Sequence, residues 1–234
     1  MDTVIADTDW KPRTAGLAAE LVAQGVLDEP AWATAFAVTP RHLFTPRVVA
    51  NDGALLLAGQ HRWLEAVYSD IALLAQTTPA GDGEQQLPTS SSSKPAVMAI
   101  MLDRLDTNPG HRLLEIGTGT GYNTALLCHR LGEGNVYSVD VHPGLVVAAG
   151  ERLARIGCHA HLVTGDGADG WVEHAPFDRI LATCAITRIP PAWIQQLADG
   201  GRIVAPLDAG DAGPLLVLDK TAPDEVTGRR RPHR

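Results

Sequence analysis

A short apolar run followed by three glycines at alternate positions constrains the fold of this chain more than any other feature. The run is RLLEI at residues 112–116, and the glycines are Gly117, Gly119 and Gly121. An apolar run without polar alternation predicts a buried parallel strand, and the glycines predict a tight turn. Residues 122–131 carry apolar side chains at helical spacing, so the turn opens a helix. Glycine lets the backbone come close to a ligand, and a helix N-terminus offers free N–H groups, so the three parts together predict a ligand site.

Composition limits the class of protein. The chain has 234 residues, a net charge of −8 and 45% hydrophobic residues, which fits one globular α/β domain with additions. Basic residues cluster only at the end of the chain, so we expect no nucleic-acid partner. Because no run of about 18 apolar residues and no signal peptide is evident, we expect no membrane partner. Three widely spaced cysteines suit a reducing compartment, and the expected location is the cytoplasm.

Beyond the glycine turn, strand-like and helix-like runs alternate as in a doubly wound sheet. Ligands of such a sheet bind beyond the carboxyl ends of its strands. The sequence predicts strands over 135–140, 159–163, 177–183, 201–206 and 215–218, and helices over 145–156 and 191–197. Polar residues and glycines stand at the predicted strand ends: Glu115, Gly117, Asp140, Asp166, Gly167 and Thr183. We expect these residues to meet in one ligand crevice.

The glycine spacing separates two nucleotide-binding classes. A dinucleotide fold requires G-x-G-x-x-G, and Tyr122 stands where its third glycine belongs. The spacing G-x-G-x-G, preceded by an acid, instead resembles the first motif of S-adenosylmethionine-dependent methyltransferases. In that motif the turn wraps the methionine part of the cofactor. The cofactor-binding residues predicted from this layout are Glu115, Gly117, Thr118, Gly119, Gly121, Asp140, Val141, Asp166, Gly167 and Thr183.

Three acids have separate predicted roles. Asp140 follows a strand and can accept hydrogen bonds from both ribose hydroxyls; its alternative is a helix N-cap ahead of Pro143. Asp166 can accept from the adenine amine, and its alternative is an ordinary Asp-Gly turn. Glu115 can orient the turn or meet the amino group of the cofactor. Because its strand is apolar, Glu115 is expected to be buried and to need a partner.

The first ninety residues read as an added front end. Helical spacing predicts helices over 16–27 and 30–38, while residues 51–76 show no single period. Arg41 and His42 lie between two prolines, a place more typical of surface residues than of a substrate contact. Residues 77–94 are polar and contain four consecutive serines, a composition typical of a flexible linker. An active-site loop is the alternative, because Pro95 can begin a helix that continues to residue 105.

From Leu87 to about Lys220 the chain resembles the protein-L-isoaspartate O-methyltransferase family. The resemblance is carried by LLEIGTGTGYNTALL, by VYSVDV, by the run from GDGADGW to GGRIVAPL, and by Ser93-Lys94-Pro95. It implies that Ser93, with Ser92 beside it, orients a substrate carboxylate without removing its charge. It implies S-adenosylmethionine as cofactor, and a peptide or protein bearing an aspartyl or isoaspartyl residue as substrate. The methyl ester then closes to a succinimide or aspartimide.

Two substrate classes stay open from the sequence. The serine-rich segment with Lys94 departs from the usual T-I-S-x-P pattern of the family, and it is similar to a branch that modifies ribosomally made peptides. Repair of isoaspartate is the other reading. From other classes, an NAD-dependent oxidoreductase shares the sheet, and a catalytically silent module with a methyltransferase fold is the third alternative. No third ligand accompanies His159 and His161, so no metal is predicted.

The predicted architecture is a Rossmann-like class I methyltransferase with a doubly wound, mostly parallel sheet. We predict a mainly helical extension over 1–76, a substrate loop or linker over 77–94, a cofactor-binding domain over 95–220 and a tail over 221–234. The family closes its sheet with an antiparallel strand pair. Residues 224–234 have almost no apolar content, so the sequence predicts that the last strand is missing and the end truncated or altered.

Overall fold

The computed structural model describes residues 10–49, 54–80, 85–210 and 213–231, which fall into two compact units. Unit 1 groups Met1–Ile100 with Gly119–Leu126, and unit 2 groups Met101–Thr118 with Leu127–Arg234. Two helices, α5 (Pro95–Arg104) and α6 (Tyr122–Leu131), contribute residues to both units. The two units follow from contacts within the folded chain, and their boundaries differ from those of the four parts predicted from sequence. The division into four parts therefore stays a prediction.

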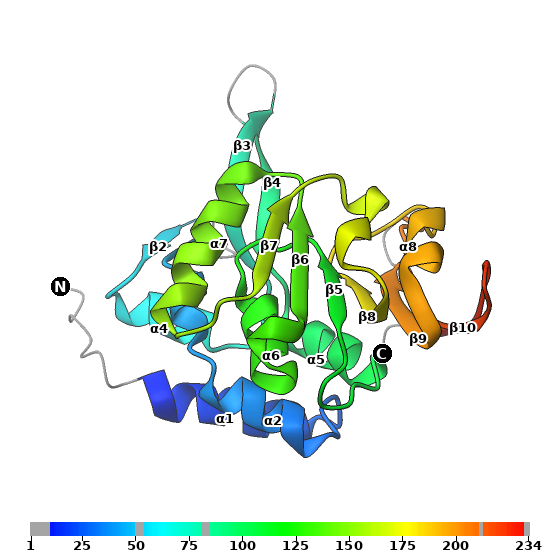
Figure 1. Cartoon of the computed structure of the whole chain (residues 1–234). Helices are drawn as coiled ribbons and strands as arrows, with labels where there is room; N and C mark the ends of the chain where they lie inside the picture. Colours follow the sequence, from blue (N-terminus) through cyan, green and yellow to red (C-terminus); the bar gives the residue numbers. More distant parts are fainter. Residues whose placement is uncertain (1–9, 50–53, 81–84, 211–212, 232–234) are drawn as a thin grey trace. The chain divides into compact units, whose positions relative to one another are not determined.

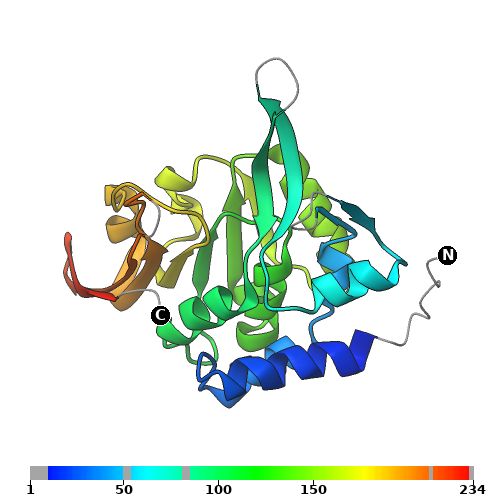
Figure 2. The same ribbon diagram turned by 180° about the vertical axis from the view of Figure 1, so that it is seen from behind.

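Unit 1 begins with two helices that pack side by side, α1 (Trp10–Ala23) and α2 (Pro30–Val38), as Figures 1 and 2 show. The buried Thr14 hydroxyl donates to the carbonyl of Phe36 at 2.9 Å and ties the two helices together. The predicted bounds of α2 are confirmed. The first helix starts earlier than predicted and ends at Ala23, because Gly25 with φ +66° terminates it.

The rest of unit 1 is a four-stranded antiparallel sheet in the order β2-β1-β3-β4, with two short helices. These elements are α3 (Arg41–Phe44), β1 (Arg47–Val49), β2 (Leu55–Leu57), α4 (His61–Val67), β3 (Leu73–Ala80) and β4 (Gln85–Ser92). Strands β3 and β4 form the long hairpin in Figures 1 and 2. Most of the segment with linker-like composition is therefore paired strand. Composition misses this because backbone pairing does not require apolar side chains.

Unit 2 is organised around a seven-stranded sheet in the order β11-β10-β9-β8-β5-β6-β7. Neighbouring strands from β9 to β7 are parallel, and the β9-β10 and β10-β11 pairs are antiparallel. The strands are β5 (Leu113–Ile116), β6 (Val136–Asp140), β7 (His161–Thr164), β8 (Phe177–Ala182), β9 (Leu197–Pro206), β10 (Leu215–Ala222) and β11 (Glu225–Arg231). The helices of this unit are α7 (Pro143–Arg155), which packs on β6 and β7 (Figure 1), and α8 (Pro191–Gln196). The predicted doubly wound fold is confirmed.

The core of unit 2 lies against the central strands. Every residue of β5 and of β6 is buried, as expected for parallel strands covered on both faces. One apolar cluster joins Ile116, Val139, Phe177 and Ile180 to Trp193 of α8. The continuous apolar runs in the sequence thus have a direct cause, because neither face of these strands meets water.

The predicted absence of the last strand is wrong. Residues Glu225–Arg231 form β11, which pairs with β10 from Leu215↔Arg231 to Ala222↔Glu225. An edge strand is held by backbone hydrogen bonds and needs few apolar residues, and charged residues are common on such edges. Val226 supplies the apolar contact, since it packs against the core cluster. Reading the arginine-rich end as a solvated tail missed this pairing.

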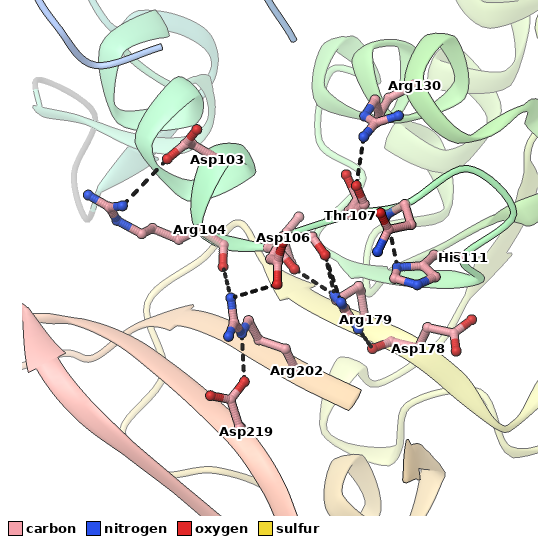
Figure 3. Close-up of polar contacts among 12 residues, drawn as sticks. Asp103, Arg104, Asp106, Thr107, His111, Arg130, Asp178, Arg179, Arg202 and Asp219 are labelled. Atoms are coloured by element: carbon pink, nitrogen blue, oxygen red, sulfur yellow. Dashed lines mark hydrogen bonds and ion pairs between the residues drawn. The ribbon is translucent and has the colours of Figure 1, made fainter. Parts of the chain in front are cut away.

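Two arginines attach the C-terminal end of α5 to the sheet of unit 2, as Figure 3 shows. Arg179 on β8 is buried and donates to the carbonyls of Leu105 and Asp106 at 2.5 and 2.6 Å. Arg202 on β9 donates to the carbonyl of Arg104 at 3.1 Å and pairs with Asp219 on β10 at 2.6 Å. The carbonyl of Arg104 ends α5 and has no partner within the helix, and the carbonyls of Leu105 and Asp106 directly follow the helix. The two arginine side chains bond these three carbonyls.

We expect Arg179→Met to lower the free energy of unfolding by about 2–4 kcal/mol, because buried carbonyls lose a charged donor. Denaturant unfolding followed by circular dichroism measures the change. Arg202→Met is the matched control: its side chain is 24% exposed, so about 1 kcal/mol or less is expected. Equal losses for the two variants would contradict this account of the α5 anchor.

Candidate functional site

Gly117, the first glycine of the turn, lies in unit 2 at the point where the strand order of the sheet reverses. Strand β5 has β6 on one side and β8 on the other, and ligands of open α/β sheets bind beyond such a switch point. Gly117 follows β5 with φ +97°, and a Cβ added to it would lie 2.5 Å from Oγ1 of Thr183. Thr183 follows β8 and donates its hydroxyl to the Gly117 carbonyl at 2.7 Å. The two predicted residues therefore form one contact, which only glycine allows.

The other two glycines of the motif also have left-handed backbones. Gly119 has φ +53° and Gly121 has φ +86°. These φ values cost a residue with a Cβ about 1–2 kcal/mol, which explains the alternate glycines. Both glycines belong to unit 1, whereas Gly117 and Thr118 belong to unit 2.

The expected partner of the buried acid is a serine. Glu115 is fully buried, and the Ser138 hydroxyl on β6 donates to its Oε2 at 2.6 Å. The Ser138 oxygen lies 2.7 Å from Oγ1 of Thr118, which donates because the Ser138 proton is already used. Glu115 is thereby linked through Ser138 to the glycine turn. The sequence predicted a partner for Glu115 but not that Ser138 supplies it, because a serine inside a strand has no distinctive pattern.

Asp140 and Val141 stand at the carboxyl end of β6. Oδ1 of Asp140 accepts from the backbone N–H of His142 at 2.9 Å, and His142, not Asp140, is the N-cap of α7. The N-cap alternative for Asp140 is therefore wrong. Val141 is 63% exposed although it is a large apolar residue. An acid beside an exposed apolar side chain at a strand end suits a ribose with an adjoining base.

Asp166 and Gly167 stand beyond the carboxyl end of β7. Oδ1 of Asp166 accepts from the N–H of Ala168 at 2.8 Å, the bond that the alternative of an Asp-Gly turn predicts. A Cβ added to Gly167 would lie 2.4 Å from Cγ2 of Ile116, so this turn packs directly on the end of β5. Trp193 of α8 fixes the turn by donating its ring N–H to the Gly167 carbonyl at 2.7 Å.

Unit 2 thus brings most of the predicted cofactor residues to one edge of its sheet. Backbone bonds join neighbouring ends: Gly117 N–H donates to Val139, Thr183 N–H to Ile116, and Gly165 N–H to Asp140. The predicted residues on this edge are Glu115, Gly117, Thr118, Asp140, Val141, Asp166, Gly167 and Thr183.

The predicted substrate serines belong to unit 1. Ser92 ends β4, and Ser93 and Lys94 join it to α5, which begins at Pro95 as predicted. Ser92 is 3% exposed, and its hydroxyl oxygen lies 3.3 Å from Nη2 of Arg41. Ser93 is half-buried, and its carbonyl accepts from Arg41 at 3.0 Å. In the described part of the chain, no hydrogen bond of the Ser93 hydroxyl is found, so the two serines differ in kind.

The expectation that Arg41 is a surface residue is wrong. Arg41 is fully buried, and burial lowers the pKa of its guanidinium to about 10, while Tyr122 and Asp70 raise it. The side chain remains a cation at neutral pH. The sequence around Arg41, between two prolines, does not indicate that the side chain is buried. Burial depends on hydrogen-bond partners that lie far along the chain, and a local pattern does not show them.

His42 is half-buried, and its Nδ1 lies 2.7 Å from the Tyr68 hydroxyl. Burial raises the pKa of Tyr68 above its usual range, so Tyr68 stays protonated. The tautomer of His42 decides which of the two groups donates. His161 stacks on Tyr137 with ring centroids 4.5 Å apart. Across the described ranges, no group of three or more metal-ligating side chains is arranged to hold a metal ion.

The fold and the sheet edge define a class I methyltransferase: a doubly wound sheet, a glycine turn at the switch point and acids at the neighbouring strand ends. The family model "Protein-L-isoaspartate(D-aspartate) O-methyltransferase (PCMT)" matches residues 13–233. The chain belongs to this family. The family assignment does not favour the NAD-dependent alternative, and the motif already lacks the third glycine at Tyr122.

Relatives with the same family name cover most of the chain. A protein-L-isoaspartate O-methyltransferase 1 from Polaromonas sp. (strain JS666) is 34% identical over 88% of this chain and 84% of its own length. Another from Anaeromyxobacter sp. (strain Fw109-5) is 38% identical over 88% of this chain and 86% of its own length. A third, from Anaeromyxobacter dehalogenans (strain 2CP-1), is 45% identical over 57% of this chain, and the match spans 64% of that relative.

Solved structures agree on the fold. A structure named protein-L-isoaspartate O-methyltransferase matches with a TM-score of 0.75 and 31% identity over 93% of this chain, and over 62% of its own chain. A putative protein-L-isoaspartate O-methyltransferase from Plasmodium falciparum, solved with S-adenosyl-L-homocysteine, matches with a TM-score of 0.69 and 17% identity over 94% of both chains. Within the described ranges, no helix has the length and apolar content needed to cross a membrane.

We expect Gly117→Ala to lower the free energy of unfolding by about 2–4 kcal/mol, because the left-handed φ is strained and the methyl group meets Thr183. Denaturant unfolding measures the loss. Gly134→Ala is the control: φ at Gly134 is ordinary, and a Cβ there meets nothing within 4 Å. A loss for Gly117→Ala no greater than for Gly134→Ala would contradict the described contact.

Proposed function

We propose that the chain is an S-adenosylmethionine-dependent O-methyltransferase that esterifies an isoaspartyl carboxylate of a peptide or protein. The observation that carries the proposal is the sheet edge with Gly117, Asp140 and Asp166 in a chain of this family. Repair follows from the chemistry of the ester, because the next backbone nitrogen attacks it and expels methanol. The succinimide that results can hydrolyse to a normal aspartate.

The edge supplies groups of the right kind for the cofactor. We infer that the turn at Gly117, Gly119 and Gly121 takes the methionine part, whose charged ends need backbone N–H groups and an acid nearby. Asp140 accepts from the ribose hydroxyls, and Val141 covers the adenine ring. Asp166 has Oδ2 available for the adenine amine, since its Oδ1 is used in the turn. Thr183 and Thr118 support the turn without touching the cofactor. Thr183 donates to the Gly117 carbonyl, and Thr118 donates to the Ser138 hydroxyl.

Ser93 is the better candidate for the substrate carboxylate. Its neighbour Ser92 is buried, and the Ser92 oxygen already accepts from Arg41. Ser93 is partly exposed, and its hydroxyl has no bond within the described residues. A single neutral hydrogen bond fixes one carboxylate oxygen and leaves the charge that the reaction needs. We therefore assign the substrate contact to Ser93 and a supporting role to Ser92.

The carboxylate needs no general base. An unperturbed side-chain carboxyl has a pKa of about 4, so the substrate carboxylate is ionised at neutral pH. One carboxylate oxygen attacks the methyl carbon in line, the bond from carbon to sulfur breaks, and the electron pair stays on sulfur as S-adenosylhomocysteine forms. Opposite charges neutralise in this step, so exclusion of water favours it, and alignment contributes further.

A tailoring reaction on a ribosomally made peptide is the second candidate. The serine run at residues 90–93 favours it, because this run departs from the usual pattern of the family and is similar to a branch that modifies ribosomally made peptides. We further propose a cytoplasmic enzyme with no nucleic-acid or membrane partner.

Methyl transfer to three peptides tests the proposal. One peptide contains isoaspartate, the second is its normal aspartate twin, and the third is a cyclised precursor peptide with the aspartate in the ring. Mass spectrometry follows the gain of a methyl group and the later loss of methanol. Reaction of the isoaspartyl peptide alone supports repair, and reaction of the cyclised peptide alone supports tailoring. Cofactor binding without any transfer would indicate a silent module and contradict the proposal.

We expect Ser93→Ala to lower kcat by about 100-fold or more, because a misaligned carboxylate loses most of the advantage of orientation. The dissociation constant for S-adenosylmethionine, measured by calorimetry, should stay within about twofold of the unchanged chain. Ser91→Ala is the matched control, since Ser91 is exposed and two residues away. Loss of cofactor binding together with turnover would assign Ser93 a structural role instead.

A further inference from the structure

One buried cation holds the segment that contains the substrate serine. The guanidinium of Arg41 has five acceptors within 3.3 Å. Three are the carbonyls of Val67, Ser69 and Ile71, in the connection between α4 and β3. The other two are the Ser92 hydroxyl and the Ser93 carbonyl. Arg41 therefore ties the connection at 67–71 to the end of β4, where the serine lies.

A carboxylate of the same connection bonds to the residues that follow that serine. Oδ1 of Asp70 accepts from the backbone N–H of Ala96 at 2.8 Å, and Oδ2 lies 3.3 Å from Nζ of Lys94. The Asp70 side chain is 10% exposed, so its charge is largely shielded from water. The carbonyl of Ser93 and the N–H of Ala96 are thus bonded to two charged side chains of opposite sign.

We propose that Arg41 and Asp70 form a clamp that positions Ser93 for the substrate carboxylate. The inference rests on the proposed function, and it assigns the two residues a positioning role, since neither is said to touch the substrate. Arg41 fixes the carbonyl of Ser93, and Asp70 fixes the N–H of Ala96, so the backbone between them has little freedom. The Ser93 hydroxyl takes no part in the clamp, so it can contact the substrate carboxylate.

The clamp also contacts the residue that follows the glycine turn. The Arg41 guanidinium lies 5.7 Å from the ring centroid of Tyr122, which Phe44 packs against. Tyr122 follows Gly121 directly in the chain and is almost fully buried. Burial raises the pKa of Tyr122 to about 12, so its ring faces Arg41 in the neutral form. Within unit 1, Arg41 therefore touches both the serine segment and the start of α6.

Arginine is required at this position for a geometric reason. The planar guanidinium can donate to several acceptors at once. A lysine ammonium has three donors on a single atom, so it cannot reach both the carbonyls of the 67–71 connection and the acceptors of the serine segment. Arg41→Lys keeps the buried charge and cannot bond both groups of acceptors, so the tie between the connection at 67–71 and the serine segment is broken. This variant therefore separates the presence of a cation from the positioning of the serine.

A double-mutant cycle between Arg41→Lys and Ser93→Ala tests the clamp with the isoaspartyl peptide. We expect Arg41→Lys to lower kcat by about 10- to 100-fold, the range that small misplacements of reacting groups produce. The dissociation constant for S-adenosylmethionine should change by less than about twofold. In the Ser93→Ala background, Arg41→Lys should change kcat by less than about twofold, because the serine through which it acts is gone. Arg47→Lys is the control, because Arg47 is exposed on β1.

Two results would overturn the clamp. Full kcat for Arg41→Lys is one, and the same fold-loss in both backgrounds is the other, since Arg41 would then act independently of Ser93. The proposed function fails differently: the unchanged chain transfers no methyl group, or Ser93→Ala keeps full turnover.

A second variant and a second readout cover the case in which Arg41→Lys does not fold. Asp70→Asn keeps an oxygen for the Ala96 N–H and loses the charge facing Lys94 and Arg41, and it enters the same cycle. Hydrogen exchange of the amides of Ser92, Ser93, Lys94 and Ala96 needs no turnover. We expect these amides to exchange about tenfold faster in either variant, while the amides of β1 are unchanged. Unchanged exchange of these amides would contradict the clamp.

Discussion

The contact between Gly117 and Thr183 sets the geometry on which the carboxyl edge of the unit 2 sheet depends. Two parallel strands, β5 and β8, end side by side, and the turn after β5 must leave the sheet without striking the turn after β8. A left-handed residue without a Cβ solves this, and the Thr183 hydroxyl then holds the carbonyl that the turn exposes. The edge is a consequence of sheet topology together with one glycine.

A buried acid gives this turn its second support. Glu115 would be costly in an apolar strand without a donor, and Ser138 on the neighbouring strand supplies one. Because Ser138 also accepts from Thr118, the charge and the turn are joined by one short chain of hydroxyls. Few of these bonds lie near the surface, which suits a binding edge that must keep its shape when the ligand leaves.

Predictions from sequence succeeded where the pattern is local. The strand and the glycines at 112–121 carry their own signal, as do the strand ends at Asp140 and Asp166, because parallel burial and left-handed turns restrict residue type. Predictions failed where a residue depends on distant partners. Arg41 reads as surface until Val67 and Ser93 are placed around it, and β11 reads as a tail until β10 is there to pair with it. Composition cannot reveal pairing partners, so the serine segment also read as linker.

The serine segment must meet two opposite requirements. Ser92 and the backbone around Ser93 are held by charged side chains, and the proposed function requires that the Ser93 hydroxyl be left for a substrate. A reaction without a general base has little besides alignment and exclusion of water to accelerate it, so rigid support of one hydroxyl is chemically reasonable.

The most direct test of this account is a crystal structure of the chain with S-adenosylhomocysteine and an isoaspartyl peptide. We expect the cofactor to lie along the ends of β5, β6 and β7, with its ribose on Asp140, and the peptide carboxylate to accept from the Ser93 hydroxyl. A cofactor bound elsewhere, or a carboxylate held by Ser92 in place of Ser93, would contradict the account.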